Sequence, residues 1–259
     1  YTNYVNKVSG QKLLRFVYDD ISSNEMSVEI VANVYSGDEF LSSRAYSIKE
    51  YAMKFLNATP SSNAAETKLR TLLVDMLNYG AAAQIYFDYN TDNLANVDLT
   101  EEQKAYASAE MKDVVSDATT VDGDADSINV KGVSISLQNT IIPYVRFNLG
   151  KHNVEDIYAT ITFEEDGEVK TVVYDSNDFL YLFDDKYAIE FDELAVTQLR
   201  TVFTVEFFDK STNEQIGDVF TYSVASYVAQ ALETTTDEEL KEIVMAMMIF
   251  GDSSVAYFA

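Results

Sequence analysis

Hydrophobic and polar residues alternate along segment 27–35, where the apolar residues on one side are Val28, Ile30, Ala32 and Val34. A period of two residues is typical of a strand with one buried face. Segment 40–46 is predicted to be its antiparallel partner, because Ser36, Gly37 and Asp38 between them favour a tight turn. The first element that the pattern predicts is therefore a β-hairpin.

The period changes to that of a helix directly after this hairpin. Ser47 and Glu50 form a capping box that begins a short helix, and Ile48, Tyr51 and Phe55 share one face of it. A second helix is predicted over 64–86, after a break at Pro60. Its apolar stripe consists of Leu69, Leu72, Leu73, Met76, Leu77 and Gly80.

Three blocks of this region recur later in the chain in the same order, with small changes in the loops between them. The matched blocks are 18–21 with 191–194, 46–52 with 222–228, and 77–80 with 248–251. The recurrence predicts two divergent copies of one unit. In the second copy it predicts helices over 223–232 and 237–257, the latter begun by a capping box of Thr236 and Glu239.

Glycine interrupts the second helix of each copy at corresponding points, Gly80 and Gly251. A glycine inside a helix costs about 1 kcal/mol relative to alanine, so its recurrence needs a physical reason. The better interpretation is that a neighbouring helix or strand packs closely against each glycine, and a role in ligand binding is less favoured.

The region between the copies begins with a short helix, predicted from about Thr100 to Glu110, and an acidic loop over 113–127. Segment 128–222 then reads as an antiparallel sandwich, in which Asp166 and Gly167 form a hairpin turn. The predicted strands are 128–137, 142–149, 157–163, 169–174, 186–192, 199–208 and 219–222. The first copy contains only the late strands of this set, over about 12–46. Its opening strands are expected ahead of Tyr1 or from elsewhere.

These elements predict an α+β fold of antiparallel β-sandwich elements, each followed by a helical hairpin, in two divergent copies. The expected divisions are a first repeat over 1–112 that lacks its opening strands, an acidic linker over 113–127, and a second repeat over 128–259. We expect the chain to be part of a longer protein, since it begins with Tyr1 and has no signal peptide.

Composition narrows the range of partners. The 259 residues carry a net charge of −25, which repels nucleic-acid phosphates and anionic membrane surfaces. No apolar run reaches the ~18 residues of a membrane span, so no membrane insertion is expected. The absence of cysteine excludes disulfides and thiolate chemistry, and is typical of secreted surface proteins of Gram-positive bacteria.

Two kinds of ligand site are predicted, each with a structural alternative. Exposed tyrosines of the sandwich region would stack against sugar rings, although a half-buried strand residue is the better interpretation of any single one of them. The candidates are Tyr144, Tyr158, Tyr174 and Tyr181. Asp122, Asp124 and Asp126 alternate with small residues, as carboxylates that bind Ca²⁺ often do, but they also fit an acidic linker. No other cofactor is expected.

Catalysis is not favoured. The single histidine, His152, lies in a predicted turn without a nucleophile motif, so a solvated loop histidine is the better interpretation. Adjacent acids such as Glu164 and Glu165 admit a glycoside hydrolase as a less favoured alternative. Nothing marks any acid pair as buried, and no catalytic residue is predicted.

The blocks Ala45 to Ala52, Leu73 to Gln84, Tyr89 to Asn96 and Leu99 to Lys104 resemble a recurrent module. It is similar to the tandem repeats of large surface and secreted proteins of gut clostridia and ruminococci, which often accompany dockerins or leucine-rich repeats. The resemblance covers nearly the whole chain and weakens in the second copy, where Asp252, Ser253 and Ser254 replace the alanine run.

This resemblance implies an extracellular, non-catalytic role in adhesion, binding or display at the cell surface. The implied partners are a polysaccharide, a host or bacterial surface protein, and neighbouring repeats of the parent protein. A carbohydrate-binding module, for a polysaccharide such as starch, is the alternative. The family supplies no defined site, so no functional residue is carried over from it.

Overall fold

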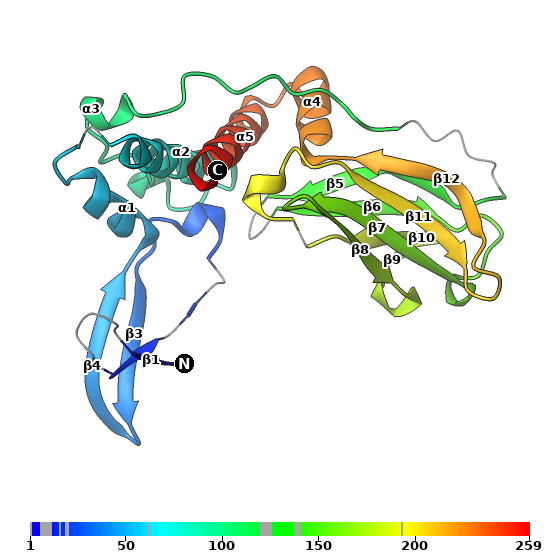
Figure 1. The fold of residues 1–259 in the computed structure, drawn as a ribbon, viewed down its shortest axis with the longest axis horizontal. Coiled ribbons are helices and arrows are strands. Elements are labelled where there is room, and N and C mark those ends of the chain that lie inside the picture. The colour runs from blue at the N-terminus through cyan, green and yellow to red at the C-terminus, as the bar shows by residue number, and fades with distance from the viewer. Residues whose placement is uncertain are drawn as a thin grey trace.

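A computed structural model describes residues 2–5, 12–15, 17–18, 21–61, 63–119, 126–137, 141–192 and 194–259. The protein combines helices with antiparallel sheets, so the α+β class is confirmed. The helices lie beside a β-sandwich, and a β-hairpin projects away from α1, downward in the view of Figure 1.

The described N-terminal strands form two separate hairpins. β1 (Thr2–Val5) pairs with β2 (Lys12–Arg15), and β3 (Ile30–Ser36) pairs with β4 (Glu39–Tyr46). Gly37 provides the positive φ of 59° that the β3–β4 turn requires. The hairpin predicted over 27–35 and 40–46 is therefore present, shifted by a few residues at its start.

Helix boundaries follow from the capping residues. In α1 (Ile48–Leu56) the Ser47 hydroxyl accepts a bond from the Glu50 amide, and the Glu50 carboxylate accepts one from the Ser47 amide. α2 (Ala64–Tyr86) begins after Asn63, as the periodicity predicted. The single 3₁₀ turns are η1 (Ser23–Glu25), η2 (Thr91–Asn93), η3 (Val154–Asp156), η4 (Ser176–Asp178) and η5 (Val196–Gln198).

α3 (Glu101–Lys104) has the expected capping box but is shorter than the helix predicted to Glu110. The chain leaves the helical path because the amide and the hydroxyl of Ser108 both donate to the Asp75 carboxylate of α2. A tertiary contact thus overrides the local helical preference of this segment.

Residues 129–222 form two four-stranded antiparallel sheets. The orders are β5-β6-β10-β9 and β12-β11-β7-β8. The strands are β5 (Asn129–Ser136), β6 (Ile142–Asn148), β7 (Ile157–Glu165), β8 (Glu168–Tyr174), β9 (Phe179–Phe183), β10 (Lys186–Glu190), β11 (Phe203–Asp209) and β12 (Gln215–Tyr222). The Asp166-Gly167 turn lies where it was predicted, between β7 and β8, and both residues have positive φ.

The two sheets share one apolar core, which makes them a sandwich. The Phe147 ring of β6 lies 4.6 Å from the Phe207 ring of β11, measured between centroids. Phe191, which follows β10, contacts both Phe163 of β7 and Phe203 of β11. Alternate residues of β6, β7 and β11 are therefore buried in this core.

The C-terminal helices are α4 (Val224–Thr234) and α5 (Glu238–Phe258). The N-cap of α5 is Asp237, whose carboxylate accepts a bond from the Leu240 amide, so the capping box predicted at Thr236 is wrong by one residue. An ionised cap at a helix N-terminus also interacts favourably with the helix dipole. α2 and α5 lie side by side and share a second apolar core with α1 and α4.

Hydrogen bonds join η1 to the residue after β5 and join α4 to the segment before residue 120. The Ser23 hydroxyl donates to the Leu137 carbonyl, and the Asp117 amide donates to the Ser226 hydroxyl of α4. The segment before residue 120 runs beside β12, where the Thr119 amide donates to the Thr221 carbonyl. Of the helices described, none is long and apolar enough to cross a membrane.

Candidate functional site

The two halves of the chain have the same order of elements at nearly constant spacing. η1, β3, β4 and α1 begin at residues 23, 30, 39 and 48, and η5, β11, β12 and α4 begin at 196, 203, 215 and 224. These starts differ by 173 residues for the first two pairs and by 176 for the last two. α2 corresponds to α5 in the same series. We call two residues matched when they occupy corresponding places in these two series of elements. Such matched positions are the most prominent feature of the molecule.

Matched positions make matched contacts around the two helix glycines. A Cβ on Gly80 would lie 2.7 Å from Sδ of Met26, and a Cβ on Gly251 would lie 2.7 Å from Cδ1 of Leu199. Met26 and Leu199 are again 173 residues apart. The close packing predicted from these glycines is therefore present in both halves.

The backbone around those contacts is also alike. The Lys49 amide donates to the Met26 carbonyl at 2.8 Å, and the Ala225 amide donates to the Leu199 carbonyl at 2.9 Å. Each of these bonds ties the start of the first helix of a hairpin to the 3₁₀ turn that precedes its strands. Both halves thus attach their strands to their helices in one way.

α2 and α5 meet through a pair of matched aromatic residues. The ring of Tyr79 stacks on that of Phe250, with centroids 5.9 Å apart and planes 20° from parallel. Contact between matched residues is what a two-fold relation between the halves would produce, as in an isologous dimer interface. Burial raises the pKa of Tyr79 to about 12, against the opposing effect of its hydrogen bond with Ser23.

A polar cluster inside the first half fixes the loop that follows α2. Gln84 is fully buried, and its amide group donates to the Ser27 hydroxyl and to the carbonyls of Asn90 and Asn93. Its carbonyl oxygen accepts from the Ala95 amide at 2.7 Å. All the hydrogen-bonding capacity of the side chain is used for structure.

Lys49 of α1 holds the same loop from the other side. Its buried ammonium group contacts Oδ1 of Asn93 at 2.9 Å, the Leu94 carbonyl at 3.0 Å and the Asp98 carboxylate at 2.7 Å. The loop belongs to the blocks that carry the resemblance described above. Those blocks therefore include residues with clear structural roles.

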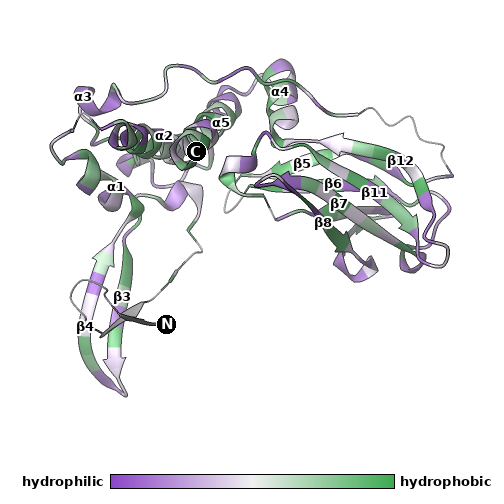
Figure 2. Cartoon of the chain, viewed as in Figure 1, coloured by the Kyte–Doolittle hydropathy of each residue, from purple (hydrophilic) through white to green (hydrophobic). Residues whose placement is uncertain are grey.

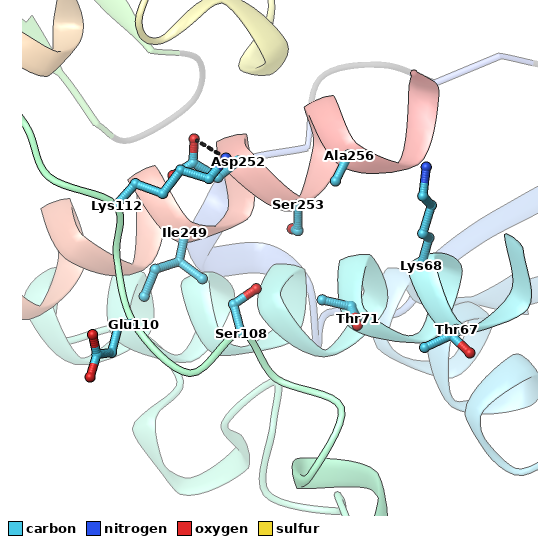
Figure 3. Close-up of a pocket in the computed structure, with 10 residues that line it drawn as sticks. All are labelled: Thr67, Lys68, Thr71, Ser108, Glu110, Lys112, Ile249, Asp252, Ser253 and Ala256. Carbon is cyan, nitrogen blue, oxygen red and sulfur yellow. Dashed lines mark ion pairs between the residues drawn. The ribbon is translucent and has the colours of Figure 1, made fainter. Parts of the chain in front are cut away.

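Figure 3 shows a cavity between α2, α5 and the segment after α3. Its volume is about 220 Å³, below the roughly 300–1,000 Å³ of ordinary ligand pockets. Lys112 and Asp252 pair at its rim, where Asp252 also binds Arg200. The amide and the hydroxyl of Ser108 donate to the Asp75 carboxylate, and the Ser253 hydroxyl donates to the Phe250 carbonyl, so these polar groups beside the cavity already have partners within the protein.

The four candidate tyrosines do not form one surface. Tyr144 of β6 and Tyr158 of β7 lie on the outer faces of opposite sheets, and Tyr174 is buried. Tyr181 of β9 is well exposed and contacts Tyr187. Burial and the nearby Glu190 carboxylate raise the pKa of Tyr144. Of the four, Tyr158 alone has an aromatic neighbour on an outer face. This neighbour is Phe208, whose ring centroid lies 5.1 Å from that of Tyr158, with the two ring planes 16° apart.

Of the three aspartates proposed to bind Ca²⁺, Asp122 and Asp124 lie outside the described residues. The Asp126 carboxylate is 3.6 Å from Nζ of Lys151. Within the described ranges, no three acidic or histidine side chains are grouped to hold a metal ion. His152 lies in the turn before η3, half-buried, where its amide donates to the Leu149 carbonyl.

No family model, no curated protein and no solved structure matches this chain.

The sequence reasoning missed the Gln84 and Lys49 cluster. A glutamine within the small-residue run of α2 was a signal, because a buried amide needs partners on every side. Its partners come from a loop without periodicity, so their identity could not be predicted.

Proposed function

We propose that this chain is a non-catalytic module of a bacterial surface or secreted protein, built from two divergent copies of one unit. Each unit consists of antiparallel strands followed by a helical hairpin. The proposed task is adhesion, binding or display outside the cell. The observation that carries this proposal is the stacked contact of the matched residues Tyr79 and Phe250.

This contact supports a role in holding β-units at fixed positions. The matched helices share one apolar core, to which Leu137 and Ile135 of the sandwich also contribute. A continuous apolar contact restrains the relative motion that domains otherwise show. In the proposal, the helices are a rigid junction and the β-surfaces meet other molecules or neighbouring repeats.

Spin labels can test the rigid junction directly, because the chain has no cysteine to remove. Labels at Lys54→Cys in α1 and Val169→Cys in β8 report on helices and sandwich, and both positions are exposed. We expect one narrow distance distribution by pulsed electron paramagnetic resonance. The pair Lys54→Cys and Lys68→Cys, within the helices, is the control. A broad distribution for the first pair alone would refute the proposal.

A carbohydrate-binding module is the second candidate, favoured by the half-exposed rings of Tyr158 and Phe208 on one outer face. Aromatic rings bury the apolar faces of sugars well. The same two residues are also a cross-strand pair, which stabilises a sheet without any ligand.

A glycan array, with pull-down on insoluble starch and cellulose in the presence and absence of Ca²⁺, separates the two candidates. A carbohydrate module should lose retention with Tyr158→Ala and keep it with Tyr181→Ala, an exposed tyrosine on the other sheet. No retention on any glycan leaves adhesion to proteins, or display, as the function to pursue.

A further inference from the structure

The β3–β4 hairpin exposes several large apolar side chains. Phe40 and Leu41 are each 55% exposed, and Val31 and Tyr35 on the neighbouring strand are more than half exposed as well. Figure 2 shows hydrophobic residues along this projecting hairpin. A two-stranded ribbon is at best marginally stable in water, and its free edges invite pairing with another strand. The hairpin therefore needs a cover.

The matched positions indicate which strands would bury this hairpin. β3 and β4 correspond to β11 and β12, which have the same lengths and the same pairing at the helix-proximal end. Ile30 lies opposite Tyr46 in the first hairpin, and Phe203 lies opposite Tyr222 in the second. Phe203 is fully buried, whereas Ile30 is only half-buried and the next residue on that face, Ala32, is exposed.

Two neighbours bury the second hairpin. The outer edge of β11 pairs with β7, and the inner face of the hairpin meets the sheet of β5, β6, β10 and β9. In the first half, the only strand that pairs with β3 among the described residues is β4. The open edge of β3 thus corresponds to the edge that β7 occupies in the sandwich.

The remaining strands of the first half fit the same scheme. β1 and β2 precede β3 by nearly the spacing at which β9 and β10 precede β11, with more residues between the two strands. The first half therefore contains counterparts of β9 to β12 among its described strands. The counterparts of β5 to β8 are the ones not found there.

We infer that β1 to β4 form part of a second sandwich, and that its open side receives a four-stranded segment built like β5–β8. This segment belongs to another copy of the repeat unit, and its strand equivalent to β7 pairs antiparallel with β3. The inference rests on the two-copy organisation proposed above and adds the identity of the partner.

The charge pattern fits such a partner. β3 contains no charged residue, so a neighbouring strand can pair along its whole length without burying an unpaired charge. Arg44 of β4 is exposed at the position of the buried Phe220. The incoming segment therefore differs from β5–β8 at this point, and the fusion described below, which uses β5–β8 itself, carries Arg44→Phe to restore the apolar residue of the matched position.

Hydrogen exchange of the 259-residue chain is the first test. Amides of β3 and β4 should exchange at least about 100-fold faster than those of β11 and β12, because the matched hairpin lacks its neighbours. Equal protection of the two hairpins in the chain alone would overturn the inference, since no cover would then be needed.

The second test supplies the cover from this chain. Residues 126–178, which include β5–β8, are joined in front of Tyr1, in the order that the second half has. We expect at least about 10-fold slower exchange across β3 and β4 in the fusion. The control fusion has Ile161→Asp in the added segment only, which disrupts its inner face and should restore fast exchange.

Unchanged exchange in the first fusion would overturn the inference, and a strand from an unrelated protein would then be the partner to seek. This result is distinguishable from a failure of the proposed function. The Lys54 and Val169 label pair reports on the helical junction and does not depend on β3 or β4.

Discussion

At the scale of single residues, buried polar side chains in the first half fix loops. Gln84 and Lys49 together satisfy the polar backbone of the loop after α2, and Arg70 donates to the carbonyls of Leu56 and Ala58 between α1 and α2. Burying a polar group without hydrogen-bond partners costs stability. Each of these side chains therefore stabilises the fold only when its hydrogen bonds are made.

Replacement of Gln84 by leucine should cost roughly 2–4 kcal/mol of unfolding free energy, because it leaves a buried amide and two carbonyls without their partner. Urea denaturation of the variant measures this cost. The matched position in α5 is Val255, which is exposed, and Val255→Leu should change stability by less than about 0.5 kcal/mol. Equal effects at the two positions would contradict the structural role of Gln84.

Asp75 should make the fold less stable at neutral pH than an uncharged residue would. Burial raises the pKa of Asp75, although the two hydrogen bonds from Ser108 oppose the rise. The folded chain therefore binds this proton at a pH where the unfolded chain has released it, so ionisation costs stability above the raised pKa. That cost disappears as the pH falls toward the ordinary value.

The variant Asp75→Asn can keep both contacts with Ser108 and cannot ionise. It should gain stability relative to the parent chain at pH 7, and the gain should shrink as the pH is lowered toward about 4. Urea denaturation at several pH values gives the difference. Asp38→Asn, at an exposed turn, is the control, and a difference for Asp75→Asn that is independent of pH would refute the argument.

At the scale of elements, helix-to-turn packing through glycine recurs in both halves. A Cβ at Gly251 would also meet the Val196 carbonyl at 3.0 Å, whereas at Gly80 the nearest atoms belong to the flexible Met26 side chain. A backbone carbonyl moves less easily than the flexible thioether side chain of methionine. An added methyl group should therefore be tolerated better at Gly80 than at Gly251.

Gly251→Ala should therefore lower the free energy of unfolding by about 1–3 kcal/mol, because the cost of overpacking exceeds the gain in helix propensity. Gly80→Ala should cost less, since Met26 can adopt another rotamer. Thermal or urea unfolding of both variants measures which substitution destabilises the chain more. If Gly251→Ala proved the more stable of the two, the close contact at α5 would not exist as described.

The sequence predicted those elements whose residues repeat with a clear period. α2 and the β7–β8 turn lie where their patterns placed them, because amphipathic periodicity and Asp-Gly turns act locally. β9 was missed because Phe179 to Phe183 are all apolar and show no alternation. The early end of α3 depends on Asp75, far away in sequence, and no local signal reports such a contact.

At the scale of the whole molecule, net charge acts against compactness. The chain carries 43 acidic and 18 basic residues, and its exposed acids repel one another in the folded state. Among the described ion pairs, Lys104 with Glu101 and Lys151 with Asp126 are exposed at both partners and contribute little. We expect long-range repulsion to outweigh the local pairs, because acidic residues are in large excess.

Added salt should raise the melting temperature at pH 7, because ions screen repulsion over a Debye length of about 8–10 Å. Differential scanning calorimetry between 0.02 and about 0.5 M NaCl tests this. Sodium chloride is preferred to sulfate, which strengthens apolar burial by itself. A melting temperature that falls with NaCl would mean that ion pairs, and not net repulsion, control the electrostatics of the fold.

The stacked pair of Tyr79 and Phe250 has a consequence for the history of the chain. If the halves arose by duplication, a self-facing position in the ancestor would have contacted the same residue of a second molecule. The single-unit ancestor would then have been a homodimer, in which each mutation on the axis altered both sides of the interface at once. Fusion into one polypeptide would have removed that constraint and allowed tyrosine and phenylalanine to diverge.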